Sequence, residues 1–193
     1  MSRAPDTRAR IEAAALALFA EKGVDGTSTR DIAKAVGVTE GALYRHFASK
    51  DELARALFLS RYGGFAAGVE QIRAKAEPFP ATAAALVRFF YAAFDADPDA
   101  FAYVLVTQHD HLGGMDRDAP ENVVAALART LADAMARGEI AQGDVALVSA
   151  LALGLVVQPA IFRLYGRLPQ PPSAYAEEVT RAVLAAVRFT TPA

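Results

Sequence analysis

The chain has 193 residues, of which 53% are hydrophobic and 22% are charged, and it contains no cysteine. This composition is too apolar for an intrinsically disordered protein and too evenly charged for an ordinary membrane protein, so we expect a folded chain. The absence of cysteine excludes disulfide frameworks and thiolate metal sites, and it is compatible with a location in the reducing cytoplasm. The first ten residues are charged and lack the apolar core of a signal peptide, so export is not expected.

Charge is unevenly distributed along the chain. Residues 1–50 carry 8 Lys/Arg and 6 Asp/Glu, a net charge of +2, whereas the remainder carries 12 and 16, a net charge of −4. A polyanionic partner is therefore expected at the N-terminal end, although the whole chain is acidic.

The N-terminal part of the chain carries the signals of closely packed helices. A first helix is expected between Asp6, its candidate cap, and Gly23, a typical helix stop. A second helix begins after Ser28, which has the capping-box spacing to Asp31. The apolar positions of these two helices are Ile11, Ala15, Leu18 and Phe19 in the first and Ile32, Ala33 and Val36 in the second.

A glycine-centred turn separates the second helix from a short third helix. Gly37 can adopt the left-handed conformation that turns the chain, Val38 can fill the corner, and Thr39 is the candidate cap of the third helix. This helix is expected to end near Phe47, with Leu43 and Phe47 facing inward.

Longer and more apolar helices are expected in the rest of the chain. A fourth helix opens where Ser49 and Glu52 repeat the capping-box spacing, and Gly63 with Gly64 is expected to break or bend it. Turn residues separate the helices that follow. These are predicted at roughly 65–77, 81–95, 98–111, 121–137, 144–167 and 173–189.

The second and third helices with their glycine turn have the arrangement of a helix-turn-helix, whose second helix is expected to enter the major groove of DNA. Arg30 is the expected reader of guanine, because its fork matches the O6 and N7 acceptors, and Glu40 is a candidate acceptor for cytosine. The expected phosphate contacts are Thr29, Tyr44, His46 and Lys50. The exposed face of the third helix comprises Thr39, Glu40, Gly41, Ala42, Tyr44, Arg45 and His46.

The segments 28–33, 37–39, 41–47 and 49–53 resemble the tetracycline-repressor (TetR) family, and the resemblance covers residues from about 7 to 57. It implies an all-α fold, with a three-helix helix-turn-helix domain at 1–50 and a larger helical ligand-binding and dimerisation domain at 51–193. It also implies a dimer, a palindromic operator and a small-molecule inducer. The family's usual DNA contacts fall by position on Thr29, Arg30, Thr39, Glu40, Gly41, Ala42, Tyr44, His46 and Lys50. Glu40 departs from the family, because it is acidic where a neutral or basic residue is common.

Residues 145–162 form a run of 18 positions without charge, at the lower length limit for a membrane-spanning helix. Gln158 and Pro159 within the run and the absence of a second such segment in the sequence argue against a membrane. We expect instead a helix covered by its own core and by a second copy of the chain, in an intermolecular four-helix bundle. The predicted interface comprises Leu151, Leu155, Tyr175, Val179, Val183 and Ala186.

The ligand pocket is predicted only as a search area of aromatic and mixed residues. That area comprises Phe90, Phe94, Phe101, Tyr103, Gln108, His109, Gln158, Phe162 and Tyr165.

No cofactor, metal site or enzymatic activity is expected. The motif His109-Asp110-His111 is a poor metal site, since residues two apart point to separate faces of a helix. A cysteine nucleophile, a glycine-rich phosphate loop and an HExxH motif are missing from the sequence.

The leading hypothesis is a repressor that binds a palindromic operator as a dimer and is released by a small, largely apolar effector. The alternative is a helical small-molecule carrier or interaction protein with a vestigial DNA-binding head. Selection of DNA fragments separates the two, because a repressor enriches one palindromic site and a carrier enriches none.

Overall fold

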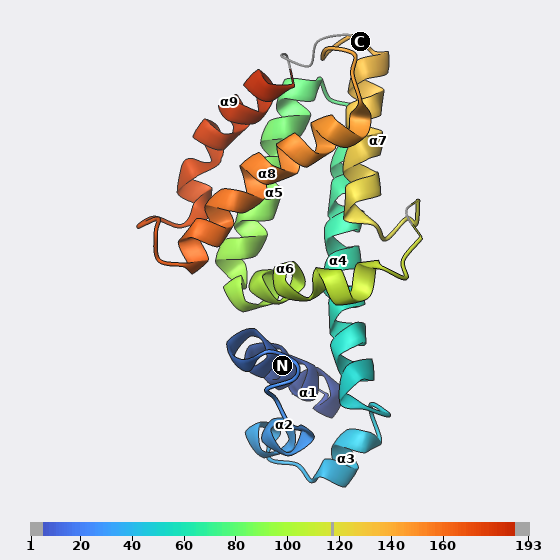
Figure 1. The fold of residues 1–193 in the computed structure, drawn as a ribbon, viewed down its shortest axis with the longest axis vertical. Helices are drawn as coiled ribbons and strands as arrows, with labels where there is room; N and C mark the ends of the chain where they lie inside the picture. The colour runs from blue at the N-terminus through green and yellow to red at the C-terminus, as the bar shows by residue number, and fades with distance from the viewer. Residues whose placement is uncertain (1–5, 117, 188–193) are drawn as a thin grey trace, which may run out of the picture. The chain divides into compact units, whose positions relative to one another are not determined.

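The structure is a computed structural model that describes residues 6–116 and 118–187, and in this part of the chain the regular elements are all helices (Figure 1). The all-α prediction is therefore confirmed. The elements are α1 (Thr7–Lys22), α2 (Thr29–Val36), α3 (Glu40–Tyr44), α4 (Lys50–Arg73), α5 (Phe79–Ala96), α6 (Pro98–Leu112), α7 (Val123–Ala136), α8 (Val145–Leu164), the 3₁₀ turn η1 (Pro172–Tyr175) and α9 (Ala176–Ala186).

The chain forms two compact units. The first contains the described residues up to Arg61 together with Asp99–Gly114, and the second contains Tyr62–Pro98 and the described residues from Met115 onward. This division differs from the predicted boundary between residues 50 and 51. α4 contributes its first half to one unit and its second half to the other, and α6 returns to the first unit.

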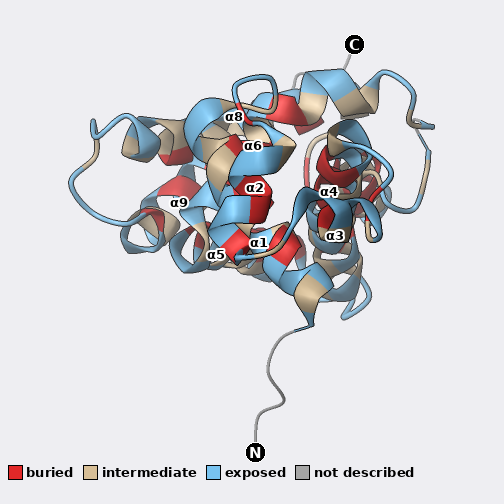
Figure 2. Ribbon diagram, turned by 90° about the horizontal axis from the view of Figure 1, so that it is seen from below, coloured by how far each residue is buried: buried red, intermediate tan, exposed pale blue. Residues whose placement is uncertain are grey.

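α6 joins the first unit through Tyr103, which is 1% exposed. The Tyr103 hydroxyl donates a hydrogen bond of 2.7 Å to the carbonyl oxygen of Ala54 in α4. Its ring stacks on Phe19 of α1 with 5.9 Å between the ring centroids. Buried residues on α1 and α2 complete this core (Figure 2). Sequence periodicity predicts that α6 has an apolar face, but which unit covers that face depends on long-range packing.

α4 runs without interruption through Gly63 and Gly64, so these glycines do not break the helix, which was one of the two predicted outcomes, a break or a bend. Both glycines keep a negative φ, and neither adopts the left-handed conformation that ends a helix. The side chains of Tyr62, Ala66 and Val69 are buried on one side of this stretch. Their packing outweighs the helix propensity lost at two glycines, about 2 kcal/mol in total.

The core of the second unit is built around α5. Near its start, Phe79 and Ala83 belong to one cluster with residues of α7 and α8. Further along, Val87 and Tyr91 form a second cluster with Val179 and Val183 of α9. The latter pair was predicted at the dimer interface, and the structure places it inside the chain's own core, at 8% and 5% exposure.

Candidate functional site

The start of α2 is held by the predicted capping box. The Asp31 amide donates to the Ser28 hydroxyl at 3.1 Å, and the Ser28 amide donates to the Asp31 carboxylate at 3.1 Å. The hydrogen bonds from the Ser28 hydroxyl and amide lower the pKa of Asp31. Because every partner lies within four residues, the sequence alone was enough to predict this cap.

The turn between α2 and α3 also has the predicted geometry. Gly37 adopts a left-handed conformation with a φ of 74°, and the Val38 amide donates to the carbonyl oxygen of Ala33 at 3.0 Å. Thr39 then caps α3, since its hydroxyl accepts a hydrogen bond from the Ala42 amide at 3.2 Å. α3 ends at Tyr44, earlier than predicted.

Buried side chains hold α3 in the first unit. Leu43 is fully buried and Phe47 is 1% exposed, so both predicted inward positions are confirmed. The Arg8 guanidinium lies 4.5 Å from the centroid of the Phe47 ring, a cation–π arrangement that covers this ring from the side of α1. The Arg10 guanidinium donates to the Val36 carbonyl at the end of α2. A helix of five residues is too short to persist by itself, so these contacts determine where α3 lies.

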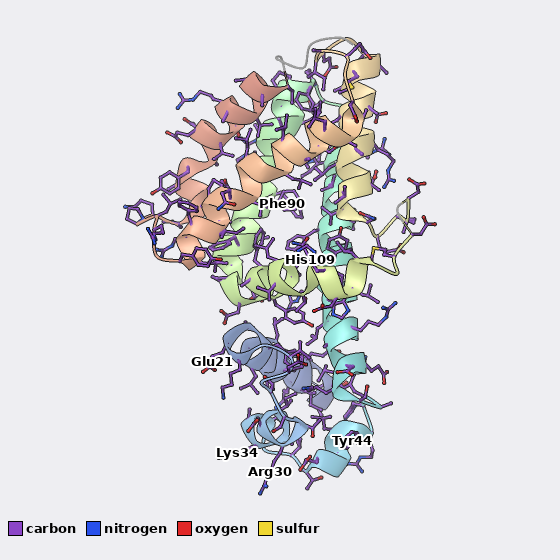
Figure 3. All side chains as sticks on the ribbon, in the orientation of Figure 1. Glu21, Arg30, Lys34, Tyr44, Phe90 and His109 are labelled. Atoms are coloured by element: carbon purple, nitrogen blue, oxygen red, sulfur yellow. The ribbon has the colours of Figure 1, made fainter. Side chains whose placement is uncertain are left out.

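The exposed surface of α2 and α3 carries most of the predicted DNA contacts. Arg30 is exposed and makes no hydrogen bond or ion pair with other described residues, and Tyr44 is 50% exposed. Arg30 and Lys34 project from α2 and Tyr44 from α3, whereas Glu21 lies on α1 (Figure 3). The other predicted contacts on this surface are exposed at Thr39, Glu40, Gly41 and Arg45 and partly exposed at Thr29, Ala42 and His46.

Lys50 has structural partners that the sequence did not indicate. Its ammonium donates to the carbonyl oxygens of Val24 at 2.6 Å and Thr27 at 3.0 Å, in the loop between α1 and α2. Thr27 is itself 2% exposed. Since an ammonium carries three N–H groups, one remains for a phosphate. Lys50 therefore stabilises the fold of this unit, and its contact with a phosphate stays a prediction.

The predicted ligand search area is divided between the two units. Phe101, Tyr103, Gln108 and His109 lie on α6 in the first unit, where the two aromatic rings are buried in its core. The other members lie in the second unit, with Phe90 and Phe94 buried on α5, and Gln158, Phe162 and Tyr165 exposed on or directly after α8. The residues of the search area therefore include both buried core positions and exposed surface positions.

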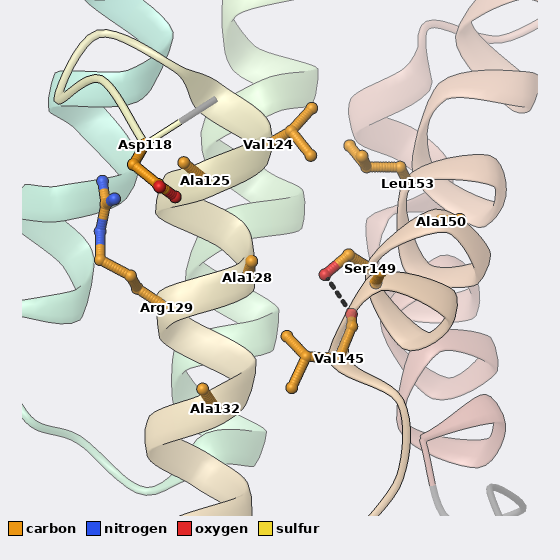
Figure 4. A pocket seen from close by; sticks show the side chains of 11 residues that line it. Asp118, Val124, Ala125, Ala128, Arg129, Ala132, Val145, Ser149, Ala150 and Leu153 are labelled. Carbon is orange, nitrogen blue, oxygen red and sulfur yellow. Dashed lines mark hydrogen bonds between the residues drawn. The ribbon is translucent and has the colours of Figure 1, made fainter. Parts of the chain in front are cut away.

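A pocket of about 540 Å³ lies between α7 and α8, and none of its lining residues belongs to the search area (Figure 4). Ser149 is the hydroxyl residue of the lining, and its hydroxyl donates to the Val145 carbonyl at 2.7 Å. The pocket is lined by Asp118, Val124, Ala125, Ala128, Arg129, Ala132, Val145, Ala146, Ser149, Ala150 and Leu153. Small apolar side chains predominate in this lining. Because ordinary core helices have the same composition, sequence periodicity could not identify these residues as pocket residues.

Arg129 of this pocket belongs to an ion-pair network. Its guanidinium contacts the Glu70 carboxylate at 2.9 Å, and Glu70 also accepts from Arg73 at 2.7 Å. Arg73 in turn contacts Asp133 at 2.7 Å. The positive charge of Arg129 is therefore compensated inside the unit.

α8 presents an apolar face to the outside of the second unit. One set of its exposed positions recurs every three or four residues and so lies on one side of the helix. They are Leu147, Leu151, Gly154, Gln158 and Phe162, with Tyr165 directly after the helix, and we call this set the α8 stripe. Of the predicted interface residues, Leu151 lies on the stripe, and Leu155 and Tyr175 pack against the core instead.

By length and composition α8 is the one helix in the described part of the chain that could cross a membrane. Its mean hydropathy is 2.2, and 17% of its apolar window is buried. A single helix of this kind is weak support for a membrane, because helices of soluble proteins meet the same test. α8 also contacts α5, α7 and α9, which a membrane span would have to leave.

Comparison with known proteins connects this geometry to a family. Residues 11–57 match the sequence model of the bacterial regulatory proteins of the tetR family. The chain is 40% identical over 92 residues to the HTH-type transcriptional repressor KstR2 of Rhodococcus jostii, an alignment that covers 46% of this chain and 43% of KstR2. The chain thus spans less than half the length of this relative.

Solved structures share the fold over most of the chain. The TetR family regulator PfmR of Thermus thermophilus has a TM-score of 0.74 at 24% identity, covering 91% of this chain and 97% of PfmR. FadR of Bacillus subtilis, solved in complex with stearoyl-CoA, has a TM-score of 0.74 at 19% identity, covering 93% and 98%. Residues 11–57 are thus similar in sequence to the N-terminal part of the tetR family of bacterial regulatory proteins, and the chain has the fold of these solved regulators.

Proposed function

We propose that this chain is a DNA-binding transcriptional regulator, acting as a repressor on a palindromic operator. The observation that carries the proposal is the preformed helix-turn-helix, in which a capped α3 exposes Tyr44 and Arg45 and α2 exposes Arg30, which has no ion-pair partner among residues 6–116 and 118–187. Small Gly41 on the same face lets the helix approach base edges closely. Repression is supported by the relative KstR2, whose name describes a repressor. We propose a cytoplasmic location, because a regulator of this kind must reach DNA, and we propose no catalytic role.

The experiment is selection of DNA duplexes from a randomised library with the full chain. A regulator of this kind enriches one palindromic sequence, with half-sites about one helical turn apart. The helical carrier that the sequence left as an alternative enriches nothing. Failure to recover a shared sequence at low salt would therefore contradict the proposed function.

We infer that the active form is a homodimer whose interface includes the α8 stripe. Exposed Leu147, Leu151 and Phe162 lie along one face of a helix that carries no charge at its centre. A second copy of the chain covers such a face on both molecules at once under two-fold symmetry. The same symmetry matches the two half-sites of a palindrome. Val179 and Val183 are left out of this interface, because they are buried inside the chain.

The proposed effector is a small, uncharged and largely apolar molecule that binds between α7 and α8. The pocket volume of about 540 Å³ lies in the range of ordinary small-molecule sites. Its charged lining residues are Asp118 and Arg129, and Arg129 already faces Glu70. An anionic effector would therefore meet no free positive charge among the described lining residues, whereas the alanine walls suit an apolar body.

Release of a labelled operator duplex by added compounds tests this effector class. Uncharged apolar compounds are expected to release the DNA, and stearate and stearoyl-CoA serve as anionic comparisons. Ala128→Phe, which fills the pocket, should abolish release and leave DNA binding intact. Ala136→Phe is the matched control, since Ala136 is exposed on α7 outside the pocket lining. Release by the anions alone would contradict the charge argument, and unchanged release from Ala128→Phe would contradict the pocket.

A further inference from the structure

Two polar side chains from different helices meet on the candidate DNA surface. Thr29 is the first residue of α2, and Glu40 is the first residue of α3. The Thr29 hydroxyl donates a hydrogen bond of 2.9 Å to Oε2 of Glu40. Glu40 is exposed, and Oε2 accepts the one hydrogen bond that its side chain makes with other described residues. One carboxylate oxygen is therefore used within the protein, and the other can still accept.

This contact changes the roles expected for both residues. Since the Thr29 hydroxyl has one proton and gives it to Glu40, it cannot donate to a phosphate at the same time. The carboxylate also brings a negative charge to the surface that exposes Arg30 and Arg45. Every duplex presents phosphates to this surface, so the charge of Glu40 weakens binding to all of them.

We propose that Glu40 is a specificity-determining residue of the DNA interface. Its negative charge lowers the affinity of the chain for every duplex, and the lost affinity is recovered only where a base donates a hydrogen bond to the free carboxylate oxygen of Glu40. The inference rests on the proposed function and adds a residue that discriminates by repulsion. An exposed cytosine amine in the major groove is the donor that matches a carboxylate. A repulsive element that only the correct sequence compensates raises the ratio of operator to non-operator affinity. The bond to Thr29 keeps the carboxylate, and with it α3, at a defined position beside α2.

The test compares Glu40→Gln with the wild-type chain on the operator recovered by selection and on a scrambled duplex of the same composition. Gln keeps an oxygen that can accept from Thr29 and removes the charge. We expect the variant to bind the scrambled duplex about threefold to tenfold more tightly, and the ratio of operator to scrambled affinity to fall at least about fivefold. The gain on scrambled DNA should shrink at high salt, because the repulsion is screened.

Two further variants separate this role from a structural one. Glu21→Gln removes an equal charge from an exposed position on α1 and should leave the affinity ratio unchanged. Thr29→Val removes the hydrogen bond and keeps the side-chain shape, so it should weaken operator binding, and its effect should not add to that of Glu40→Gln. If Glu40 only tethered α3, Glu40→Gln would leave both duplexes unchanged, and that result would overturn the inference.

The outcomes also distinguish this inference from the proposed function. A wild-type chain that enriches no duplex contradicts the regulator itself. A wild-type chain that enriches an operator, together with Glu40→Gln binding scrambled DNA no more tightly, contradicts the role of Glu40 alone. Equal effects of Glu40→Gln and Glu21→Gln would assign the change to net charge and would likewise overturn the inference.

Discussion

Two buried tyrosines differ in whether the hydroxyl group has a hydrogen-bond partner. Tyr103 donates to the carbonyl oxygen of Ala54 at 2.7 Å, whereas the Tyr91 hydroxyl is fully buried without a hydrogen-bond partner among the described residues. Burial raises the pKa of each hydroxyl to about 12, so both groups are neutral at physiological pH. An unpartnered buried hydroxyl costs about 1 to 3 kcal/mol, and a paired one contributes about 1 kcal/mol.

Replacing each of these tyrosines with phenylalanine should change the free energy of unfolding in opposite directions. Tyr91→Phe should stabilise the chain by about 1 kcal/mol, because it removes a buried polar group that has no partner. Tyr103→Phe should destabilise it by a similar amount, since the Ala54 carbonyl loses its donor. Urea unfolding at pH 7 measures both free energies. A loss of stability in Tyr91→Phe would mean that a bound molecule satisfies the hydroxyl.

Arg30 and Lys50 were both predicted to contact DNA, and the structure now separates their effects. Arg30→Ala should leave the unfolding free energy unchanged, cost about 1 to 3 kcal/mol of operator affinity and relax the preference at one base. Lys50→Ala should weaken binding to all duplexes and flatten the salt dependence by about one unit. It should also lower stability, because the carbonyls of Val24 and Thr27 lose their donor. Binding across a salt series and urea unfolding measure these effects, and identical profiles for the two variants would contradict the assignment.

Among the helices, α4 departs most clearly from its sequence pattern. Gly63 and Gly64 suggest a break, yet the helix continues to Arg73. One turn later, Gly68 has a packing reason to be glycine: a Cβ added there would clash with Cζ of Phe89 and lie 2.7 Å from both Cε atoms of that ring. Phe89 cannot easily yield, because its ring packs against Phe65 and Phe90.

Gly64 and Gly68 therefore form a matched pair on one helix. Gly64→Ala should stabilise the chain by about 0.5 to 1 kcal/mol, since the added methyl group meets open space and alanine favours the helix. Gly68→Ala should destabilise it by about 1 to 2 kcal/mol, because the clash with Phe89 outweighs the same gain. Thermal unfolding monitored by circular dichroism measures both. A stabilised Gly68→Ala would show that α4 and α5 can move apart at no cost.

Helix ends show where local signals are sufficient. Ser28 with Asp31, Gly37 and Thr39 were predicted with their roles, because each acts on residues at most four positions away. Asp6 has the same chemistry and lies at the N-cap of α1, but its side chain makes no capping hydrogen bond. The presence of a capping residue type is therefore not sufficient for a capping hydrogen bond.

Assembly of two chains is the feature of the whole molecule that is most directly testable. Leu151→Glu places a charge at the centre of the α8 stripe, where Leu151 is 47% exposed. We expect this variant to sediment as a folded monomer at micromolar concentration and to bind a full palindrome much more weakly than the wild-type dimer. Val106→Glu is the control, because Val106 is 74% exposed and lies on α6. A wild-type chain that sediments as a monomer would contradict the proposed interface.

The resemblance to the tetR family, the all-α class and the helix-turn-helix geometry of α2 and α3 could be predicted from the sequence, because caps, glycine turns and helical periodicity act over a few residues. The partners of Lys50, the contact between Thr29 and Glu40, the return of α6 to the first unit and the burial of Val179 required the folded chain. Each of these contacts joins residues at least eleven positions apart. A side chain carries the same local signal whether it meets a core, a second helix or solvent, so only packing in three dimensions decides among them.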